Sequence, residues 1–250
     1  MDVLISTLNP SSFAAQIPLA NAAKIAGVKR FVPCSFATIA PPRGVMVLRD
    51  MKEDVFDHVK KIRVPYTIID VGWWFQLSIP GLPSGRGQYA TIMAANTVAK
   101  DGDLPSALTD SRDIGRWVAR IIADEKTLNK QVFAYNEVMS PNQVRDLFER
   151  LSGEKIEYHS ISEDSILETI DRVKSSKQPQ DVNKLYSMQY LYSIGIRGDN
   201  TPEYAQYLGY LDANQLYPDV KKNSLQSFLQ EVLDGKAVSA YAHKFAAAKN

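Results

Sequence analysis

The sequence predicts an α/β fold built on a parallel sheet, followed by a smaller and mostly helical region. Short apolar runs at residues 2–7, 30–34 and 66–71 alternate with segments of helical spacing at 12–26 and 45–62. Apolar runs without polar alternation are typical of strands that are buried on both faces, as in parallel sheets. The order strand, helix, strand also implies right-handed crossovers between parallel neighbours.

Composition and charge exclude several classes of protein. At 250 residues, with 45% hydrophobic and 23% charged residues, the chain is an ordinary globular sequence that can bury a sizeable core. The net charge of +1 gives no overall attraction to nucleic acid or to an anionic membrane. No apolar run reaches the roughly 20 residues that a bilayer requires. The single cysteine, Cys34, excludes an internal disulfide and suits a reducing compartment. We therefore expect a cytoplasmic protein.

The chain changes character after Gly72, which suggests two domains. Residues 1–137 are expected to form the sheet domain, with an irregular insertion at about 73–95 that is rich in tryptophan, proline and glycine. Inside this insertion, residues 88–94 are expected to form a strand. Residues 138–250 are expected to form a mainly helical substrate-binding or lid region, partly interleaved with the first domain, and its Ala- and Lys-containing tail is expected to fray.

The helical region carries a cluster of tyrosines whose role the sequence leaves open. They are Tyr186, Tyr190, Tyr192, Tyr204, Tyr207 and Tyr210. Tyrosine and leucine at helical spacing most often indicate a packed lid or an interface. Aromatic contacts to a substrate are the alternative.

The ends of the first two strands are candidate site positions. In open parallel sheets, ligands bind at the carboxyl ends of the strands. Residues 7–9 and 34–36 follow two such strands, and so they are expected on the rim of a site.

The sequence around the other candidate catalytic or metal-binding residues gives little support for such a role. A helical lysine such as Lys52 is usually a solvated charge. Tyr217 and Lys221 fit a Tyr-x-x-x-Lys spacing, but Pro218 places them in a turn, and we treat the match as accidental. The three histidines lack metal-ligand spacing, so no metal site is predicted.

Several ordered stretches together resemble one known family. They are Asp-Val-Leu-Ile-Ser-Thr at 2–7, Ala-Ala-Lys-Ile-Ala-Gly-Val-Lys-Arg-Phe-Val-Pro at 22–33, Val-Pro-Tyr-Thr at 64–67, Asp-Ile-Gly at 113–115, Thr-Leu-Asn-Lys at 127–130 and Leu-Tyr-Pro-Asp at 216–219. The set resembles the NmrA-like and isoflavone-reductase-like branch of the atypical short-chain dehydrogenases. Gly-Trp-Trp at 72–74 with the following Phe-Gln resembles fungal members in particular.

This resemblance implies a Rossmann-like sheet and a site that binds NADPH or NADH. In reductases of this family a lysine stands thirteen residues before the proline of the Pro-Tyr-Thr strand, and counting back from Pro65 gives Lys52. Its implied role is to contact the nicotinamide ribose and to act as a general acid and base. The positions implied to bind cofactor are Thr7, Leu8, Asn9, Cys34, Ser35, Phe36, Lys52, Trp74, Phe75 and Gln76.

Two departures from the family pattern affect these expectations. The plant-type loop Pro-Ser-Glu-Phe-Gly is here Pro-Cys-Ser-Phe-Ala at 33–37, which lacks the acid and the glycine. The family also begins with a strand, a glycine-rich phosphate loop and two further strands. At about 30 residues for each strand–helix–strand unit, roughly 70 residues are expected to be missing before Met1. The strand at 2–7 would then be an apolar edge.

The expected function is reduction of an aromatic or polyketide-like small molecule by an NAD(P)H-dependent enzyme. Because the glycine-rich loop is not in the sequence, the sequence leaves open that the chain is an inactive fragment of such an enzyme. The alternative is a nonenzymatic NmrA-like regulator that senses dinucleotide and binds a protein partner. A homodimer is also compatible with the sequence, whereas direct nucleic-acid binding and membrane association are not expected.

Overall fold

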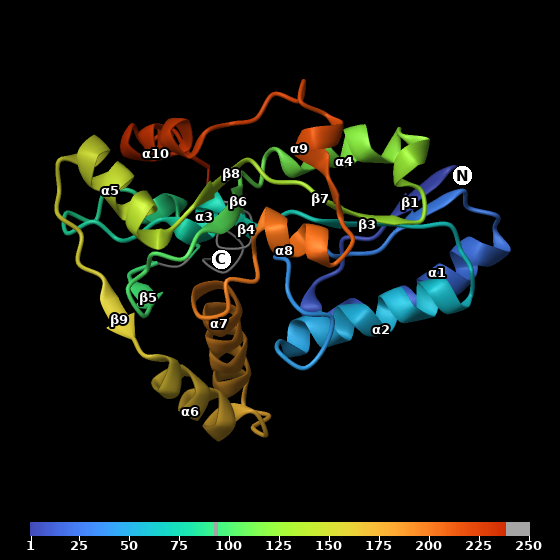
Figure 1. Cartoon of the computed structure of the whole chain (residues 1–250), viewed down its shortest axis with the longest axis horizontal. Coiled ribbons are helices and arrows are strands. Elements are labelled where there is room, and N and C mark those ends of the chain that lie inside the picture. Colours follow the sequence, from blue (N-terminus) through green and yellow to red (C-terminus); the bar gives the residue numbers. More distant parts are fainter. Residues whose placement is uncertain (93–94, 239–250) are drawn as a thin grey trace, which may run out of the picture.

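Five parallel strands form the central sheet of the molecule (Figure 1), a computed structural model that describes residues 1–92 and 95–238. In spatial order they are β1 (Val3–Ile5), β2 (Arg30–Val32), β3 (Thr67–Asp70), β7 (Lys130–Phe133) and β10 (Leu211–Asp212). A single bridge between Phe31 and Tyr66 joins β2 to β3. Within the described residues β1 pairs with β2 alone, and so it lies at the edge of the sheet with Ile5 39% exposed.

Helices cover both faces of this sheet, which confirms the predicted α/β class. Helices α1 (Gln16–Ile25) and α2 (Val47–Lys61) lie on one face, and α4 (Ile114–Ile122) and α9 (Ala213–Leu216) lie on the other (Figure 1). Successive residues of β3 serve the two cores. Ile68 packs in the cluster that contains Val55 and Phe56 of α2, whereas Ile69 packs in the cluster that contains Trp117 of α4. Because alternate side chains of a strand point to opposite faces, a continuous apolar run is needed to fill both cores.

The region after Gly72 contains short strands that the sequence did not indicate. Two of them, β4 (Trp73–Trp74) and β6 (Ser106–Thr109), are parallel, and β8 (Glu137–Met139) completes this small mixed sheet. A second pair is formed by β5 (Thr97–Ala99) and β9 (His159–Ile161). Strands of two to four residues are too short to show a period in the sequence.

The strand predicted at residues 88–94 is wrong. Residues Gln88–Ala90 form a 3₁₀ turn, η2, that follows Gly87 in the left-handed region. The hydroxyl of Tyr89 donates a hydrogen bond to the carbonyl oxygen of Val232 at 2.9 Å, and Ala90 is fully buried in the core. Residues 93 and 94 lie outside the described residues.

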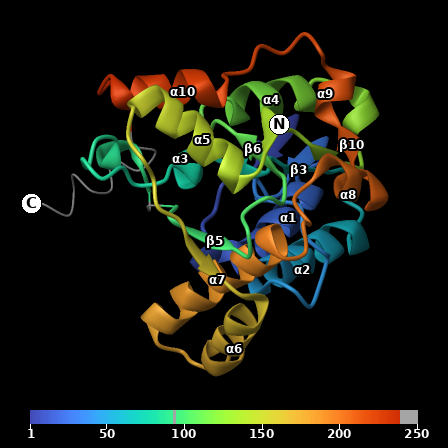
Figure 2. The same ribbon diagram turned by 60° about the vertical axis from the view of Figure 1, so that its left-hand side comes forward.

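Most of the remaining chain is helical, as predicted. The helices are α3 (Phe75–Ser78), α5 (Pro141–Ser152), α6 (Glu163–Val173), α7 (Pro179–Gly195), α8 (Pro202–Tyr207) and α10 (Leu225–Leu233), with the 3₁₀ turns η1 (Pro10–Ala15) and η3 (Glu125–Thr127). Ser140 and Ser162 cap α5 and α6. Helices α6 and α7 project as a pair away from the central sheet, whereas α5 lies beside α10 (Figure 2).

Strand β10 belongs to the predicted second domain but pairs with β7 of the first. The two predicted regions are therefore interleaved at the sheet, and the boundary at residue 137 stays a prediction. The tail that was expected to fray, residues 239–250, lies outside the described residues.

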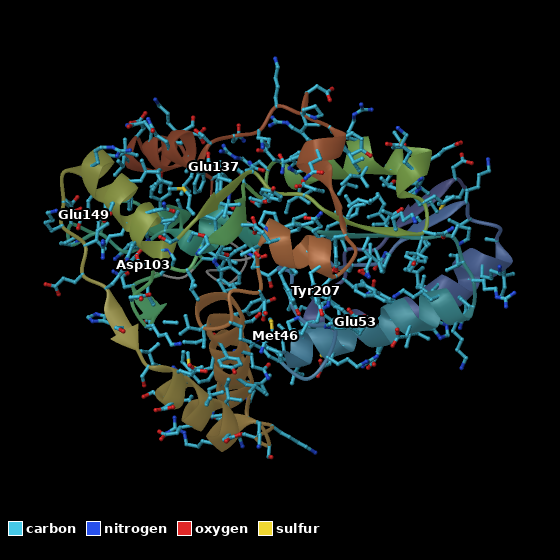
Figure 3. The ribbon with its side chains drawn as sticks, viewed as in Figure 1. Met46, Glu53, Asp103, Glu137, Glu149 and Tyr207 are labelled. Atoms are coloured by element: carbon cyan, nitrogen blue, oxygen red, sulfur yellow. The ribbon has the colours of Figure 1, made fainter. Side chains whose placement is uncertain are left out.

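The start of α2 and the turn after β3 position the candidate site. Figure 3 locates Met46 at the start of α2 and Glu53 farther along the same helix. Gly72 follows β3 with a φ of 74°, and a Cβ at this position would lie 2.5 Å from the carbonyl oxygen of Ala107. Only glycine allows the chain to turn here while it approaches the backbone of β6 so closely.

Replacement of Gly72 by alanine should therefore destabilise the fold more than an ordinary substitution in the left-handed region. Gly153 is the matched control, since it has the same φ of 74° but no atom within 4 Å of its ideal Cβ. We expect Gly153→Ala to cost about 1 kcal/mol, or roughly 2–4 °C in melting temperature. Gly72→Ala should cost at least about twice as much, measured by thermal unfolding. Equal losses for the two variants would contradict the close approach of Gly72 to Ala107.

Candidate active site

A cavity of about 830 Å³ opens at the carboxyl ends of β1 and β2. Eight of the ten residues predicted to bind cofactor line it, namely Thr7, Leu8, Asn9, Cys34, Ser35, Phe36, Lys52 and Trp74. The topology explains why. Parallel strands place their carboxyl ends at the same edge of the sheet, and α2 starts near that edge, so Lys52 in its second turn stays close to it.

The side chains of Phe75 and Gln76 do not line this cavity, and their role in cofactor binding stays a prediction. Phe75 is fully buried in a separate core, with its ring centroid 5.9 Å from that of Phe228. The amide of Gln76 donates to Asp110 at 3.1 Å and accepts from the backbone of Ser111 at 3.3 Å. Both residues begin the short helix α3, which turns their side chains away from the cavity that Trp74 reaches.

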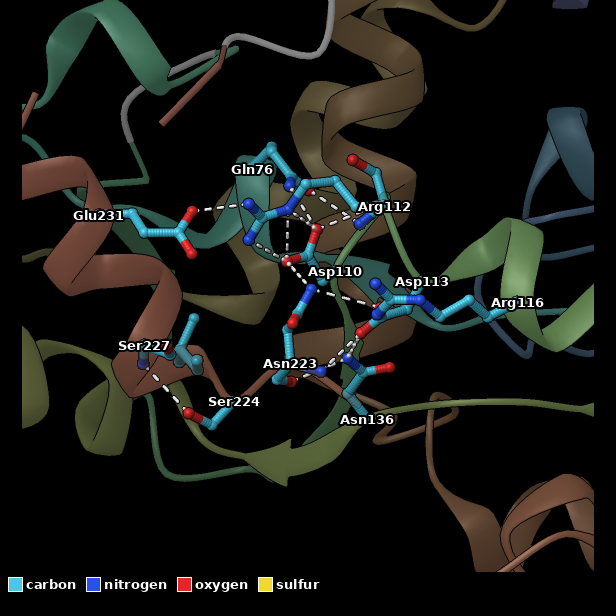
Figure 4. A network of polar contacts seen from close by, with 12 residues as sticks. Gln76, Asp110, Arg112, Asp113, Arg116, Asn136, Asn223, Ser224, Ser227 and Glu231 are labelled. Carbon is cyan, nitrogen blue, oxygen red and sulfur yellow. Dashed lines mark hydrogen bonds and ion pairs between the residues drawn. The ribbon is translucent and has the colours of Figure 1, made fainter. Parts of the chain in front are cut away.

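Gln76 instead belongs to a polar network that ties α4 to the segment before α10 (Figure 4). Asp110 pairs with Arg112, which also reaches Glu231 of α10 at 2.6 Å. Asp113 accepts hydrogen bonds from Asn136 and from the backbone of Asn223. This network stabilises the backbone beside Ser111, Ile114 and Gly115, which line the cavity.

Lys52 is buried, and so the interpretation of this residue as a solvated surface charge is wrong. Its side chain is 6% exposed, and Nζ donates to the carbonyl oxygen of Ser35 at 2.7 Å. The ring of Phe13 lies 5.6 Å from the ammonium. No carboxylate within the described residues forms an ion pair with it. Burial lowers the pKa of Lys52 to about 8, and the charge of Asp70 opposes part of this effect. The group is thus a cation at neutral pH that can release and regain its proton.

Cys34 lines the cavity as a protonated thiol. Its Sγ donates to the carbonyl oxygen of Leu8 at 3.1 Å, and its backbone amide donates to Gln16 Oε1 at 2.7 Å. Burial raises the pKa of the thiol. Because the thiolate is the reactive form, this environment does not activate Cys34 as a nucleophile.

The walls of the cavity include aromatic residues that sequence reasoning did not assign to the site. Trp73 of β4 and Tyr190 of α7 both line it, with ring centroids 5.0 Å apart. Burial raises the pKa of Tyr190 to about 12, so its phenol stays protonated and can donate a hydrogen bond. Tyr190 is one of the six clustered tyrosines, and nothing in its spacing distinguishes it from the other five.

The Tyr-x-x-x-Lys match at 217–221 lies elsewhere. Tyr217 is buried, does not line the cavity, and donates its hydroxyl to Asp124 at 2.9 Å. Across residues 1–92 and 95–238, no three histidine, cysteine or carboxylate side chains come together in a way that could hold a metal ion. In the same part of the chain, no helix combines the length and the apolar character needed to cross a bilayer.

Comparisons with known proteins agree with the fold. The family described as NmrA-like matches residues 1–229. Asnovolin J 5′,6′-dehydrogenase of Aspergillus novofumigatus is 45% identical over 242 residues, which cover 94% of this chain and 74% of the relative. A probable pinoresinol-lariciresinol reductase 3 of Arabidopsis thaliana is 27% identical, with coverage of 93% and 76%.

Among solved structures, the binary complex of leucoanthocyanidin reductase with NADPH from Vitis vinifera aligns with a TM-score of 0.77 at 19% identity. It covers 94% of this chain and 76% of the other. The likeness shows a shared fold and confirms the predicted Rossmann-like class. The predicted family is confirmed by the family match, and the Aspergillus relative fits the expected resemblance to fungal members.

The depressed pKa of Lys52 predicts a specific pH dependence of stability. The folded-state pKa of about 8 lies below the ordinary value of 10.5, so the unfolded chain binds more protons between these two pH values. The free energy of unfolding of the wild type should therefore rise with pH across this window, relative to that of Lys52→Met. The difference should change by on the order of 3 kcal/mol. Denaturant titrations at pH 7 to 10.5 measure it.

Lys61→Met is the matched control, because Lys61 is an exposed lysine on the same helix. Its stability difference from the wild type should stay flat across the window. A flat difference for Lys52→Met as well would show that Lys52 titrates as it does in water.

Proposed function

The chain belongs to the NmrA-like family, and from this premise we propose that it is a nicotinamide-dependent reductase that acts on a small molecule in the Lys52 cavity. One observation carries the proposal. A buried ammonium without an ion-pair partner in the described residues lies on a cavity at the carboxyl ends of parallel strands. A lysine whose pKa is lowered by burial, in a cleft, is a candidate functional group on physical grounds.

The residues that line the cavity fit the nicotinamide half of NADPH or NADH. The volume of about 830 Å³ is in the range of ligand sites. Lys52 uses one of its three ammonium protons on the Ser35 carbonyl among the described contacts, which leaves two for a ligand. Thr7 and Asn9 add polar groups at the end of β1. The bound cofactor would supply a hydride.

The chemistry that falls to this chain is proton handling and orientation. With a pKa of about 8, Lys52 carries its proton at Nζ at neutral pH and can give it to an oxygen that gains negative charge. Its contact with the Ser35 carbonyl fixes the position from which the proton is donated. A ribose hydroxyl and a substrate oxygen are the two acceptors that we assign to it.

The walls favour a substrate with a planar or largely apolar skeleton. Phe36, Trp73, Trp74 and Tyr190 line the cavity together with aliphatic side chains. Such a surface gains free energy by covering rings and alkyl groups, whereas the few polar groups orient the substrate. We therefore propose an aromatic or polyketide-like substrate, in keeping with the relatives, whose names include a dehydrogenase of asnovolin J and a reductase of pinoresinol and lariciresinol.

The alternative function from the sequence, a regulator that senses dinucleotide and binds a protein partner, would use the same cavity. A protein partner, a homodimer and a cytoplasmic location stay predictions. Turnover separates the two functions, because a regulator binds dinucleotide without oxidising it.

The cofactor proposal is tested with reduced nicotinamide mononucleotide, which carries only the nicotinamide half of the dinucleotide. Binding of the mononucleotide should quench the fluorescence of Trp73 and Trp74. Lys52→Met should raise the Kd of the mononucleotide by about tenfold, because a charged hydrogen bond is lost. Lys61→Met should bind like the wild type. NADPH oxidation is then followed with a panel of aromatic and polyketide-like ketones and enones. If no nicotinamide compound binds, or if Lys52→Met binds unchanged, the proposal fails.

The substrate side is tested by Tyr190→Phe, which keeps the aromatic ring and removes the hydroxyl. If the phenol donates to the substrate, KM should rise by roughly tenfold, the value of one hydrogen bond, with a smaller change in kcat. Tyr207→Phe is the control, since Tyr207 is 82% exposed. An unchanged KM for Tyr190→Phe would show that the hydroxyl of Tyr190 does not contact the substrate and that only its ring lines the cavity.

A further inference from the structure

A buried polar cluster lies directly behind Lys52. Asp70, Arg49, Glu53 and Tyr210 do not line the cavity, whereas Ser35, which joins them to Lys52, does. Its centre is Asp70, the last residue of β3, which is fully buried. Asp70 accepts hydrogen bonds from Arg49 Nη1 at 2.9 Å, from the hydroxyl of Tyr210 at 2.7 Å, and from the hydroxyl of Ser35. Both of its carboxylate oxygens are therefore occupied.

Arg49 closes the cluster from the side of α2. Its Nε donates to Glu53 at 2.8 Å and its Nη2 donates to the hydroxyl of Tyr210 at 2.8 Å. Arg49 and Glu53 are 4% and 6% exposed. Removal of one partner of a buried ion pair leaves the other charge without compensation. The cluster is therefore stable only when all of its hydrogen-bond partners are present.

Four separate segments meet in this cluster. Arg49 comes from α2, Asp70 from β3, Ser35 from the loop after β2, and Tyr210 from the residue before β10. The cluster thus fixes the loop after β2 relative to α2 and to the C-terminal part of the chain.

Ser35 connects the cluster to Lys52. Its hydroxyl donates to Asp70, and its carbonyl oxygen accepts from Lys52 Nζ at 2.7 Å. Arg49 and Lys52 are three residues apart on α2 and so project from the same side of the helix. A rotation of the Ser35 peptide would move the carbonyl that holds the ammonium, and the bond from Ser35 to Asp70 opposes that rotation.

We propose that Asp70 is a positioning residue for Lys52, which it orients through Ser35, and that Arg49 and Tyr210 hold Asp70 in place for this task. The proposal rests on the proposed function only where it treats Lys52 as the group that meets the reactants. It adds a role for Tyr210, through which the segment before β10 takes part in the site without lining the cavity.

A carboxylate near an ammonium also favours its charged form. The titratable and charged groups around Lys52 are Cys34, Arg49, Glu53, Asp70, Tyr190 and Tyr210. Among them, Asp70 raises the pKa of Lys52 and Arg49 lowers it, against the larger effect of burial. Loss of the Asp70 charge should therefore lower the pKa of Lys52 further.

The test measures the Lys52 ammonium directly by NMR, with lysine labelled at Cε and Nζ and with neither cofactor nor substrate present. The Lys52 signal is assigned by its loss in Lys52→Met. Ser35→Ala removes the hydroxyl bond to Asp70, Tyr210→Phe removes both bonds of the phenol, and Asp70→Asn removes the charge. Tyr207→Phe and Asp57→Asn are the matched controls, on an exposed tyrosine and an exposed aspartate.

We expect exchange of the Lys52 ammonium protons with water to accelerate by about tenfold or more in Ser35→Ala and Tyr210→Phe, because opening of the Ser35 contact becomes easier. Asp70→Asn should lower the pKa of Lys52 by about one unit. The controls should leave both quantities unchanged. A cluster that only stabilises the fold would lower the melting temperature without moving either one.

Unchanged ammonium exchange and pKa of Lys52 in folded Ser35→Ala and Tyr210→Phe would overturn the proposal. These two variants decide the matter even if Asp70→Asn does not fold, since each keeps the charges of Asp70 and Arg49. The measurement involves no turnover, so its failure and the failure of the reductase proposal are separate results.

Discussion

The burial of two cations on one side of α2 is the constraint on which the candidate site depends. An ammonium or guanidinium that leaves water loses several kcal/mol of hydration unless hydrogen bonds replace it. Arg49 receives this replacement in full, from Asp70, Glu53 and Tyr210, whereas the only hydrogen bond of Lys52 within the described residues is to the carbonyl of Ser35. The difference explains why Arg49 is a fixed structural charge and Lys52 is the one that can exchange its proton with a ligand.

The framework of the fold could be predicted because it follows from burial. Ile68, Ile69 and Val71 are apolar because they fill a core on each face of the sheet, and the serines at 140 and 162 cap helices. The short strands β4, β5, β6 and β8 could not be predicted, because two to four residues carry no measurable period. The strand predicted at 88–94 failed for a related reason. Within the described part of that stretch, Ala90 is buried in a core that includes residues of α5 and α10.

The candidate site was predictable where it follows from topology and was not where it follows from tertiary contacts. Residues 7–9 and 34–36 could be predicted as site residues because they follow β1 and β2, and Lys52 could be predicted from the family resemblance. The roles of Tyr190 and Asp70 could be found only in the structure. Tyr190 meets Trp73 across a gap of more than a hundred residues. Asp70 is the last residue of β3, a strand whose sequence indicates only a structural role. Ser35 stands where the plant-type loop has an acid, and its hydroxyl turns to the buried carboxylate of Asp70.

The position of β10 at the far edge of the sheet has a consequence for the order of folding. Residues 211 and 212 pair with β7, which lies some eighty positions earlier, and Tyr210 precedes them immediately. During synthesis, β1, β2, β3 and β7 leave the ribosome long before this segment, so the sheet and the Asp70 cluster close only when nearly the whole chain has emerged. The Asp70 cluster is therefore one of the last parts of the structure that the nascent chain can complete. Any species truncated before residue 210 would display a sheet with an open edge and an Asp70 that lacks its Tyr210 hydrogen bond.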